Sequence, residues 1–297
     1  MDLSVIIVSF NTEEFLRKLL KSIKENIGSE VAYEVVVVDN ASSDGSAQML
    51  TKEFPKVKLV ANKDNKGFSA ANNQGIKKTE KSRYILFLNP DTFLKKGTIE
   101  KMTRFMDENR DAGASTCKVV MPNGEIDDAT HRGFPTPWNA FTHFSGISKI
   151  FPKSTFLNGY YLGWKNIDQV HQIDALSGAF MLVRREAGED VGWWDEDYFF
   201  YGEDIDFCFM LKQKGWKIYY VPTVSILHHK GVSSGIKKIS KEKSTATRET
   251  KIRITKSRFA AMKIFYRKHY ANKYPKFIAG LVTIGINAKL WYSLKRI

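Results

Sequence analysis

Residues 84–91, YILFLNPD, decide the fold. The first five are branched or aromatic apolar residues, a composition typical of a strand that is buried on both faces. Asn89 and Asp91 then bring the run to a polar end. We therefore expect the Asp91 carboxylate at the carboxyl end of a central strand, which is where open α/β sheets bind their ligands.

Two upstream segments have the same form. Residues 3–10 end at Asn11, and residues 33–38 end at Asp39 and Asn40. Three apolar runs that each end in Asn or Asp predict parallel strands whose carboxyl ends line one polar cleft. Apolar spacing and turn residues predict the other elements. Helices are expected at 12–24, 46–53, 69–77, 98–109 and 203–214, and strands at 57–61, 119–121, 174–183, 217–221 and 224–227.

The composition indicates a folded protein with unevenly distributed charge. The 297 residues are 43% hydrophobic and carry a formal net charge of +14. From Lys230 onward the sequence has 18 Lys and Arg against two acidic residues, so the positive excess lies in the C-terminal part. Cys117 and Cys208 do not make a disulfide framework and favour a reducing compartment. No signal peptide is expected, because residues 1–10 have no charged n-region and become strand within a few residues. No standard membrane span is expected, because no apolar run approaches about 20 residues.

Two polar clusters farther along are candidates for chemistry. Glu203, Asp204 and Asp206 open a predicted helix after an aromatic run, and aromatic surroundings suit a carboxylate that takes a proton from a hydroxyl. His228 and His229 follow a predicted strand, and beside a carboxylate-bound cation one of them is a candidate nitrogen ligand. Each cluster also has a plainer interpretation. Carboxylates cap helices and loops, and paired histidines are often only packed.

Six blocks of sequence together resemble a known family. The blocks are VIIVSFN (5–11), VVVVDNASSDGS (35–46), NKGFSAANNQG (65–75), FLNPD (87–91), FFYGEDIDFCFMLKQKGW (199–216) and HHKGVSS (228–234). Their residues and order are similar to those of the family 2 inverting glycosyltransferases, which have the GT-A (nucleotide-diphospho-sugar transferase) fold, and in particular to the bacterial rhamnosyltransferase-like branch. The resemblance covers residues 3 to about 234, and it implies an α/β fold with a mostly parallel central sheet flanked by helices.

The resemblance implies a role for each matching residue. Asp204 falls on the position of the general base. Asp91 falls on the metal-binding Asp of an Asp-x-Asp motif and His228 on the metal-ligating histidine, with His229 as the alternative, so Mg²⁺ or Mn²⁺ is the expected cofactor. Asn89 stands where the first Asp of that motif usually stands. Contacts to the nucleotide-sugar donor are implied for Ser9, Asn11, Asp39, Asn40, Asn65, Gly67, Asn72 and Asn89.

The implied reaction is the transfer of a hexose, with inversion, from a nucleotide-diphosphate donor. The expected donor is dTDP-L-rhamnose, and the expected acceptor is a saccharide or a polyprenyl-diphosphate-linked saccharide in the synthesis of a cell-surface polysaccharide. The alternatives are a UDP-hexose or UDP-galactofuranose transferase and a non-catalytic scaffold that binds sugar nucleotides. The sequence has no P-loop, and residues 65–75 lack a GxGxxG pattern, so neither a nucleotide hydrolase nor a dehydrogenase is indicated.

We expect two parts in the chain. Residues 1–234 would form the GT-A domain, with the nucleotide-sugar-binding half at 1–112 and the acceptor-binding and catalytic half at 113–234, in which 131–170 form loops and short strands. Residues 235–297 would form a basic helical tail, whose aromatic and cationic side chains suit the surface of an anionic membrane. The tail could instead pack on the body or on a partner. Nucleic acid is not expected, since no binding module is present. The protein would then be cytoplasmic and peripheral on the inner face of the cell membrane.

Overall fold

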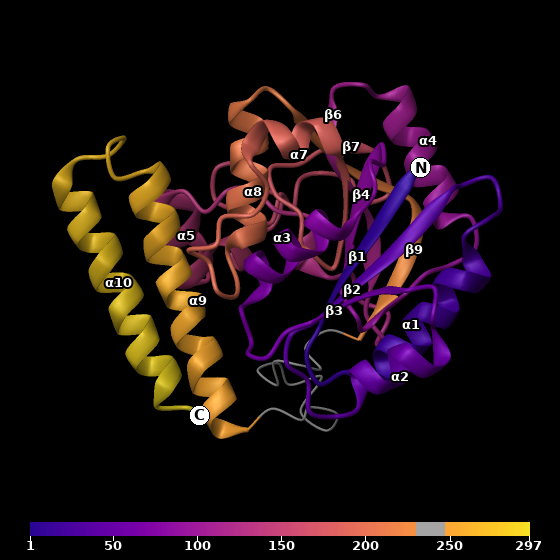
Figure 1. Cartoon of the computed structure of the whole chain (residues 1–297). Helices are drawn as coiled ribbons and strands as arrows, with labels where there is room; N and C mark the ends of the chain where they lie inside the picture. The colour runs from indigo at the N-terminus through magenta and orange to yellow at the C-terminus, as the bar shows by residue number, and fades with distance from the viewer. Residues whose placement is uncertain (230–246) are drawn as a thin grey trace.

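The computed structural model describes residues 1–229 and 247–297, and within them the chain forms one mixed sheet with helices on both faces (Figure 1). The strand order is β3-β2-β1-β4-β8-β6-β9-β5, and β7 pairs with β9. The strands are β1 Leu3–Ser9, β2 Tyr33–Asp39, β3 Lys58–Ala61, β4 Tyr84–Leu88, β5 Thr92–Phe93, β6 Ala112–Val120, β7 His171–Gln172, β8 Phe180–Arg184 and β9 Lys217–His228. The helices are α1 Glu13–Asn26, α2 Ser46–Glu53, α3 Phe68–Lys78, α4 Thr98–Glu108, α5 Pro137–Ser145, α6 Ile147–Ile150, α7 Arg185–Val191, α8 Glu203–Gln213, α9 Arg248–His269 and α10 Lys276–Leu294, with a 3-10 turn, η1, at Asp128–Thr130.

The parallel core predicted from the three apolar runs is confirmed. Strand β1 pairs in parallel with β2 on one side and β4 on the other, and Leu3 lies opposite both Tyr33 and Tyr84. All five residues of β4 are buried, as expected for a strand with helices on both faces. The polar residues that follow β1, β2 and β4 therefore meet at one edge of the sheet.

Beyond β4 the sheet becomes mixed, and this part brings distant residues to the same edge. Strand β8 pairs antiparallel with both β4 and β6, and β9 pairs in parallel with β6. The short strand β5, which begins directly after Asp91, pairs antiparallel with the end of β9, so that Thr92 lies opposite His228. The ladder between β5 and β9 thus places His228 next to the NPD segment.

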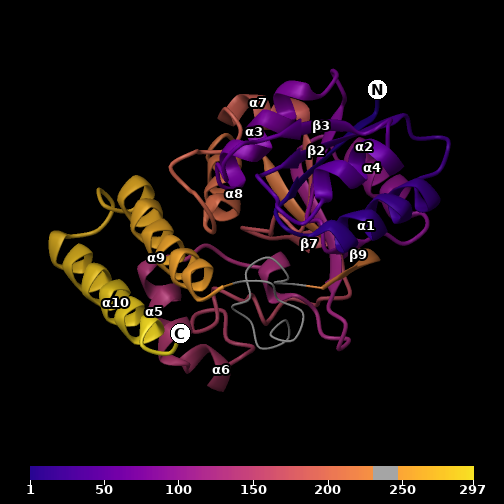
Figure 2. The ribbon, with the colours of Figure 1, turned by 60° about the horizontal axis from the view of Figure 1, so that its bottom comes forward.

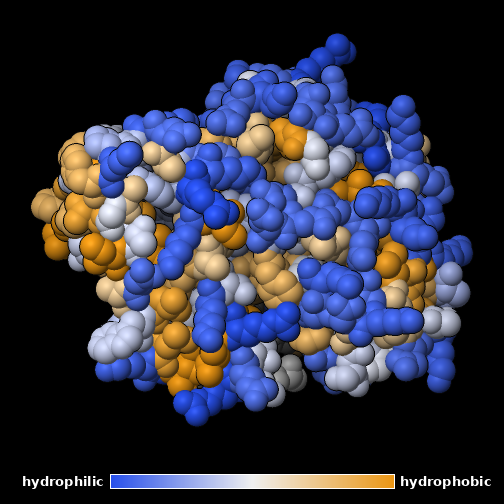
Figure 3. All heavy atoms as spheres, turned by 60° about the vertical axis from the view of Figure 1, so that its left-hand side comes forward, coloured by the Kyte–Doolittle hydropathy of each residue, from blue (hydrophilic) through white to orange (hydrophobic). Residues whose placement is uncertain are grey.

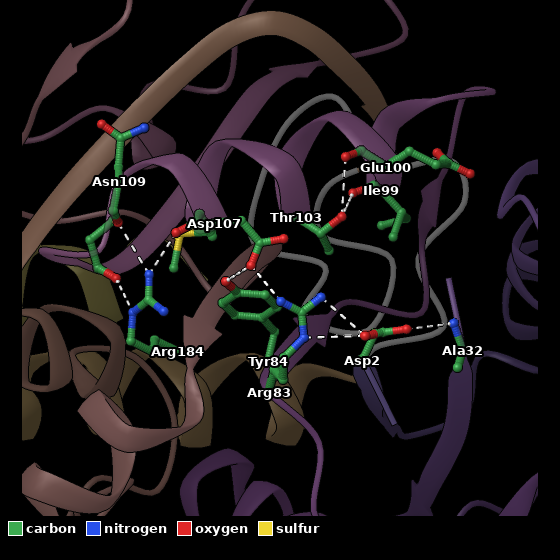
Figure 4. A network of polar contacts seen from close by, with 12 residues as sticks. Asp2, Ala32, Arg83, Tyr84, Ile99, Glu100, Thr103, Asp107, Asn109 and Arg184 are labelled. Atoms are coloured by element: carbon green, nitrogen blue, oxygen red, sulfur yellow. Dashed lines mark hydrogen bonds and ion pairs between the residues drawn. The ribbon is translucent and has the colours of Figure 1, made fainter. Parts of the chain in front are cut away.

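A polar network fixes the opposite end of β4 (Figure 4). Arg83 forms ion pairs with Asp2 and Asp107, and the Tyr84 hydroxyl donates a hydrogen bond of 2.7 Å to Asp107 Oδ1. Burial raises the pKa of Tyr84 to about 12, so its hydroxyl is a neutral donor at physiological pH. Because Asp107 lies on α4, this network holds that helix against the amino end of the central strand.

Several local predictions are wrong. The stretch 131–170 contains helices α5 and α6, where the sequence predicted loops and short strands. The missed signals are an N-cap, Thr136, whose side chain accepts from the Asn139 backbone, and a proline in the first turn of α5. The strand predicted at 174–183 is confined to β8, and the one predicted at 119–121 belongs to the longer β6. The two strands predicted at 217–221 and 224–227 are one continuous strand, β9.

The C-terminal region forms a hairpin of two helices, α9 and α10 (Figures 1 and 2). Helix α9 packs on the body, because its residues Ala261 and Phe265 are buried in a cluster with Tyr198 and Phe209. Helix α10 packs against α9 on the side away from the body, and none of its residues is buried. The proposed domain boundary at 234/235 and the last five residues of the HHKGVSS block lie outside the described residues.

Helix α10 is also the one helix among the described residues that is long and apolar enough to cross a membrane. It has 19 residues, a mean hydropathy of 1.3, and no buried part. No span was expected from the sequence, because Lys289 and several polar residues interrupt this helix and leave no long apolar run. Length and composition alone leave open whether such a helix crosses a bilayer or lies along its surface.

Candidate active site

A cleft opens at the carboxyl edge of β1, β2 and β4. Five of the predicted site residues line it, and they come from three separate segments of the chain: Asn40, Asn65, Gly67, Asn89 and Asp91. The sequence did not predict the rest of the lining, which consists of Val8, Phe10, Phe68, Pro90, Phe199, Phe200, Thr250, Arg253 and Ile254. Sheet topology thus assembles one surface from the N-terminal half, the loop before α8, and α9.

Asn40 organises one wall of the cleft. Its Nδ2 donates to Asn65 Oδ1 over 3.0 Å and to the Gly67 carbonyl over 3.2 Å. Gly67 has a φ of 86°, and a Cβ at this position would lie 2.6 Å from the Phe199 carbonyl oxygen. Glycine is therefore required here for two reasons, the left-handed backbone and the close approach of the loop that precedes α8. The Phe68 N–H donates a hydrogen bond of 2.8 Å to the Phe199 carbonyl and so holds the two loops together.

Three predicted donor-site residues form hydrogen bonds to other protein groups and do not line the cleft. Ser9 Oγ lies 2.9 Å from the Thr12 hydroxyl, and Asn11 Oδ1 accepts a hydrogen bond of 2.8 Å from the Ser43 backbone. Asn72 Nδ2 donates over 2.9 Å to the carbonyl four residues earlier in α3. In this structure these side chains hold the turns and the helix that surround the cleft.

Asp39 behaves differently, because half of its carboxylate has no partner. The residue is 3% exposed at the end of β2. Its Oδ2 accepts a hydrogen bond of 3.0 Å from the Ser42 backbone, whereas Oδ1 is buried without a hydrogen-bond partner in the described part of the chain. A buried acceptor of this kind costs free energy unless a donor reaches it, and a ligand N–H is one such donor.

Asp91 and His228 converge on one point. Asp91 Oδ1 lies 3.2 Å from His228 Nε2, and the other ring nitrogen, Nδ1, lies 3.2 Å from Asp127 Oδ2. All three side chains are buried. Burial alone lowers the pKa of His228, but the charges and hydrogen bonds of Asp91 and Asp127 outweigh it and raise the pKa to about 9.

This donor set fits a divalent cation. Asp91 and His228 offer an oxygen and a nitrogen ligand side by side, and Asp127 stands where metal sites commonly place a carboxylate that orients the imidazole. Among residues 1–229 and 247–297 no three His, Cys, Asp or Glu side chains are arranged so that all could bind one metal ion. The remaining ligands would be diphosphate oxygens and water, which is how Mg²⁺ is usually held beside a nucleotide. The sequence did not predict a role for Asp127 at this site. In the structure the same residue also caps the start of η1.

Asp204 lies in the first turn of α8 and is paired with a buried arginine. Arg132 Nη2 donates to Asp204 Oδ2 over 2.6 Å and to the Leu176 carbonyl over 3.0 Å. Arg132 lies two residues after η1, and Asp127 caps the start of that turn. One short segment therefore connects the Asp91–His228 pair to Asp204. Asp204 itself does not line the cleft; the loop just before α8 does.

Glu203, the neighbour of Asp204, is held in the protonated form near neutral pH. Burial, together with the charge of Asp204, raises the pKa of Glu203 to about 8. Its Oε2 is buried and has no hydrogen-bond partner among the residues described. Arg132 pairs with Asp204, so Glu203 and Asp204 present one neutral and one ion-paired carboxyl group side by side.

Helix α9 contributes an unexpected wall. Thr250, Arg253 and Ile254 line the cleft, and the Arg253 guanidinium lies 4.4 Å from the centroid of the Phe199 ring. Within the described residues Arg253 has no acidic partner, so its charge is not neutralised by the protein there. A cation and the Asp91 carboxylate thus border the same cleft. The sequence did not predict these cleft residues, because the basic helix was expected to belong to a separate tail.

Residues 4–192 match the protein family described as glycosyl transferase family 2. The chain belongs to this family. Two curated relatives of this transferase are rhamnosyltransferases, as the sequence analysis predicted. N-acetylglucosaminyl-diphospho-decaprenol L-rhamnosyltransferase of Mycobacterium tuberculosis is 28% identical over 243 residues, which are 78% of this chain and 78% of the relative. Rhamnosyltransferase WbbL of Escherichia coli K12 is 28% identical over 233 residues, 76% of this chain and 82% of the relative.

Solved structures confirm the GT-A fold of the transferase. The crystal structure of S. aureus TarS 1–349 has a TM-score of 0.54 at 19% identity, and the match covers 99% of this chain and 81% of that 1–349 chain. The mannosyltransferase PcManGT from Pyrobaculum calidifontis, in complex with GDP-Man and Mn²⁺, has a TM-score of 0.57 at 15% identity and covers 99% of this chain and 72% of its own. At such identities the likeness concerns the fold alone.

Proposed function

We propose that this transferase moves L-rhamnose from dTDP-L-rhamnose, with inversion and with Mg²⁺ or Mn²⁺ as cofactor, to a lipid-linked saccharide in the synthesis of a cell-surface polysaccharide. Both relatives are rhamnosyltransferases, which supports L-rhamnose as the transferred sugar. The first is named for an N-acetylglucosaminyl-diphospho-decaprenol acceptor, which supports a lipid-linked acceptor by analogy. The observation that carries the proposal is the meeting of Asp91, His228 and Asp127 beside the cleft at the ends of β1, β2 and β4.

The cleft offers matching groups for each part of such a donor. The unpartnered Oδ1 of Asp39 fits the imide N–H of a thymine or uracil base. The turn from Asn65 to Gly67, fixed by Asn40, would hold the ribose and the sugar. Arg253 borders the same cleft as Asp91 and would face the negative charge of the diphosphate. Each of these assignments follows from the chemistry of side chains that lie in or beside the cleft.

The chemistry of transfer follows from the same geometry. Asp204 would accept the proton of the attacking acceptor hydroxyl, and Arg132 holds that carboxylate in one orientation. A divalent cation bound by Asp91 and His228 would supply positive charge that neutralises the departing nucleoside diphosphate. One in-line displacement at the anomeric carbon inverts its configuration. Glu203 stays neutral beside the base and so leaves a single charged carboxylate at the point of proton transfer.

We also propose that the transferase is cytoplasmic and associates with the inner face of the cell membrane through α10. The helix exposes large apolar residues such as Phe277, Leu281 and Trp291, and its C-terminal segment is basic. Because α10 packs along α9, which is itself docked on the body, an orientation in the plane of the interface suits it. A lipid-linked acceptor would be found in that same plane.

Donor hydrolysis and transfer assays test the proposed function. The purified chain is incubated with dTDP-L-rhamnose, UDP-glucose, UDP-N-acetylglucosamine and UDP-galactofuranose, each with Mg²⁺, with Mn²⁺ and with a chelator. We expect turnover with dTDP-L-rhamnose, loss of turnover on chelation, and an inverted anomeric configuration by NMR. Turnover with a UDP-sugar instead would replace the donor, and tight donor binding without any turnover would favour the non-catalytic scaffold.

A further inference from the structure

We propose that residues 137–156, which comprise α5, α6 and the loop after them, form one docking face together with α10, and that this face binds the anionic surface of a lipid bilayer. The inference rests on the proposed membrane association of α10. It adds a second element from the middle of the chain, so that the membrane contact is a composite surface and not a property of the tail alone.

The middle segment exposes an unusual number of large apolar side chains. Six of them have exposed fractions between 40% and 71%: Trp138, Phe141, Phe144, Ile150, Phe151 and Phe156. The cluster is ordered, since the Trp138 ring lies 4.9 Å from that of Phe156 and 5.7 Å from that of Phe141, centroid to centroid. The Trp138 indole N–H also donates to the Phe156 carbonyl over 2.8 Å. A contiguous apolar surface that is this well organised is typical of an interaction site.

Helix α10 places a second apolar surface beside the first. It exposes Phe277, Leu281, Ile284, Trp291 and Tyr292 by 49% to 66%. The two elements are neighbours, because Lys289 Nζ of α10 lies 5.6 Å from the centroid of the Phe144 ring on α5. Figure 2 shows α5 and α6 next to α10, and Figure 3, which brings that side forward, shows hydrophobic side chains gathered over it. The two surfaces therefore form one face, defined here as the composite face.

Charge identifies the partner of the composite face. Residues 129–167 contain no Asp or Glu, and neither do residues 250–297. Two long segments without a single acidic residue thus lie side by side, and their charged side chains are all cationic, such as Lys149, Lys153, Lys289 and Lys295. Apolar side chains mixed with cations are the composition that binds anionic lipid head groups.

The same charges argue against a second copy of the chain as the partner. A two-fold dimer through the composite face would place identical patches against each other. Each patch would then meet the lysines of its own kind with no carboxylate available from residues 129–167 or 250–297 to neutralise them. An anionic bilayer avoids this repulsion and accommodates the aromatic rings at the depth of the head groups.

Vesicle binding by the full-length chain tests the inference. Phosphatidylcholine vesicles, with and without phosphatidylglycerol, are titrated with three variants. The first carries Phe141→Ser, Ile150→Ser and Phe151→Ser in the middle segment. The second carries Phe277→Ser, Leu281→Ser and Ile284→Ser in α10. The control carries Ile167→Ser and Val170→Ser, which are each 42% exposed and flank Asp168, the partner of Lys118 on β6.

We expect the first and second variants each to lose vesicle affinity about tenfold or more, while the control binds like the wild type. All three should keep donor hydrolysis in solution, which shows that they are folded. Binding of the wild type should require phosphatidylglycerol and weaken with salt.

Three outcomes would overturn the inference in distinguishable ways. If the middle-segment variant binds like the wild type while the α10 variant is released, the composite face is wrong and the tail association stands. If the wild type transfers sugar but binds no vesicle, the membrane association itself is wrong and the transferase stands. If ultracentrifugation shows that the wild type is a dimer and that the middle-segment variant is a monomer, a second copy of the chain covers the face.

Discussion

The Arg132 guanidinium donates a hydrogen bond of 2.6 Å to Asp204 Oδ2, and the two side chains are only 9% and 14% exposed. Burial lowers the pKa of Arg132, but the charge of Asp204 outweighs it and raises that pKa above its usual value, so the arginine keeps its charge. An ion pair with so little solvent around it restricts the orientation of the carboxylate. The proposed base is therefore held in place by a residue from the segment that follows η1.

Replacing the proposed base should abolish turnover without affecting donor binding. We expect Asp204→Asn to lower kcat by about 10²–10⁴-fold, because an amide cannot take the proton of the acceptor hydroxyl. Steady-state transfer kinetics measure kcat, and titration calorimetry measures donor affinity. The control is Asp197→Asn, which changes an exposed carboxylate in the loop before α8. Unchanged kcat in Asp204→Asn would refute the assignment.

Asp127 should act on the cation through His228. Because Asp127 holds His228 Nδ1, Asp127→Asn should weaken Mn²⁺ affinity by about 10–100-fold. Excess Mn²⁺ should then restore activity, which a purely structural defect would not allow. Titration calorimetry with Mn²⁺ in the presence of the nucleoside diphosphate measures the affinity. Glu125→Gln, at an exposed position nearby, serves as the control, and equal Mn²⁺ affinity in both variants would show that Asp127 does not orient the ligand.

Arg253 should contribute to donor affinity. Removing a cation that borders the cleft should raise the Kd for the donor about tenfold, equivalent to about 1.4 kcal/mol, in Arg253→Ala. The matched control is Lys256→Ala, an exposed cation on α9 that does not line the cleft. Fluorescence or calorimetric titration of the nucleotide gives both values. Similar Kd values for the two variants would mean that the diphosphate lies away from α9.

Glu203 should make the free energy of unfolding fall with rising pH. Its pKa is about 8 in the folded chain against a reference value of 4.5. Between these values the unfolded chain releases the proton and the folded chain keeps it, so stability declines as pH rises through this window, by on the order of a few kcal/mol. Glu203→Gln should make this slope shallower, measured by urea unfolding at about pH 5 and about pH 8. Glu186→Gln, an exposed glutamate on α7, should keep it, and an unaltered slope in Glu203→Gln would contradict the prediction.

The network in Figure 4 should affect stability alone. Tyr84→Phe removes the hydrogen bond to the exposed Asp107 carboxylate, so the free energy of unfolding should fall by about 1 kcal/mol, a typical net contribution of one hydrogen bond. Donor affinity should not change, because Tyr84 lies at the end of β4 opposite to the cleft. Thermal melts with and without donor check both statements. A change in donor Kd would show that the two ends of β4 are coupled.

Local pattern was sufficient for the parallel half of the fold. Strands β1, β2 and β4 are continuous apolar runs that end in Asn or Asp, and the parallel pairing of such runs brings Asn40, Asn89 and Asp91 to one edge. The approach of His228 could not be derived in that way. It depends on the pairing of the two-residue strand β5 with β9, which has no periodicity to detect, and only the family resemblance pointed to it.

Other parts of the site depend on tertiary packing that a sequence does not display. Asp127 and Arg132 flank a 3-10 turn too short to show a period, and their partners lie far away in the chain. Arg253 reaches the cleft only because Ala261 and Phe265 dock α9 on the body. The sequence predicted a basic helical tail at residues 235–297 but not where its helices pack.

Helix α9 contacts the candidate active site and the start of α8 at three positions along its length. Arg253 lines the cleft near its start, Ala261 packs under the turn at Gly202, and Lys268 and His269 in its last turn grip Asp206 with contacts of 2.8 Å and 2.6 Å. A helix is stiff along its axis, so these contacts cannot be displaced independently. The 22-residue helix connects α10 rigidly to the turn that begins α8. A displacement of α10 would therefore move both the first turn of α8, which carries the proposed base Asp204, and the Arg253 side of the cleft.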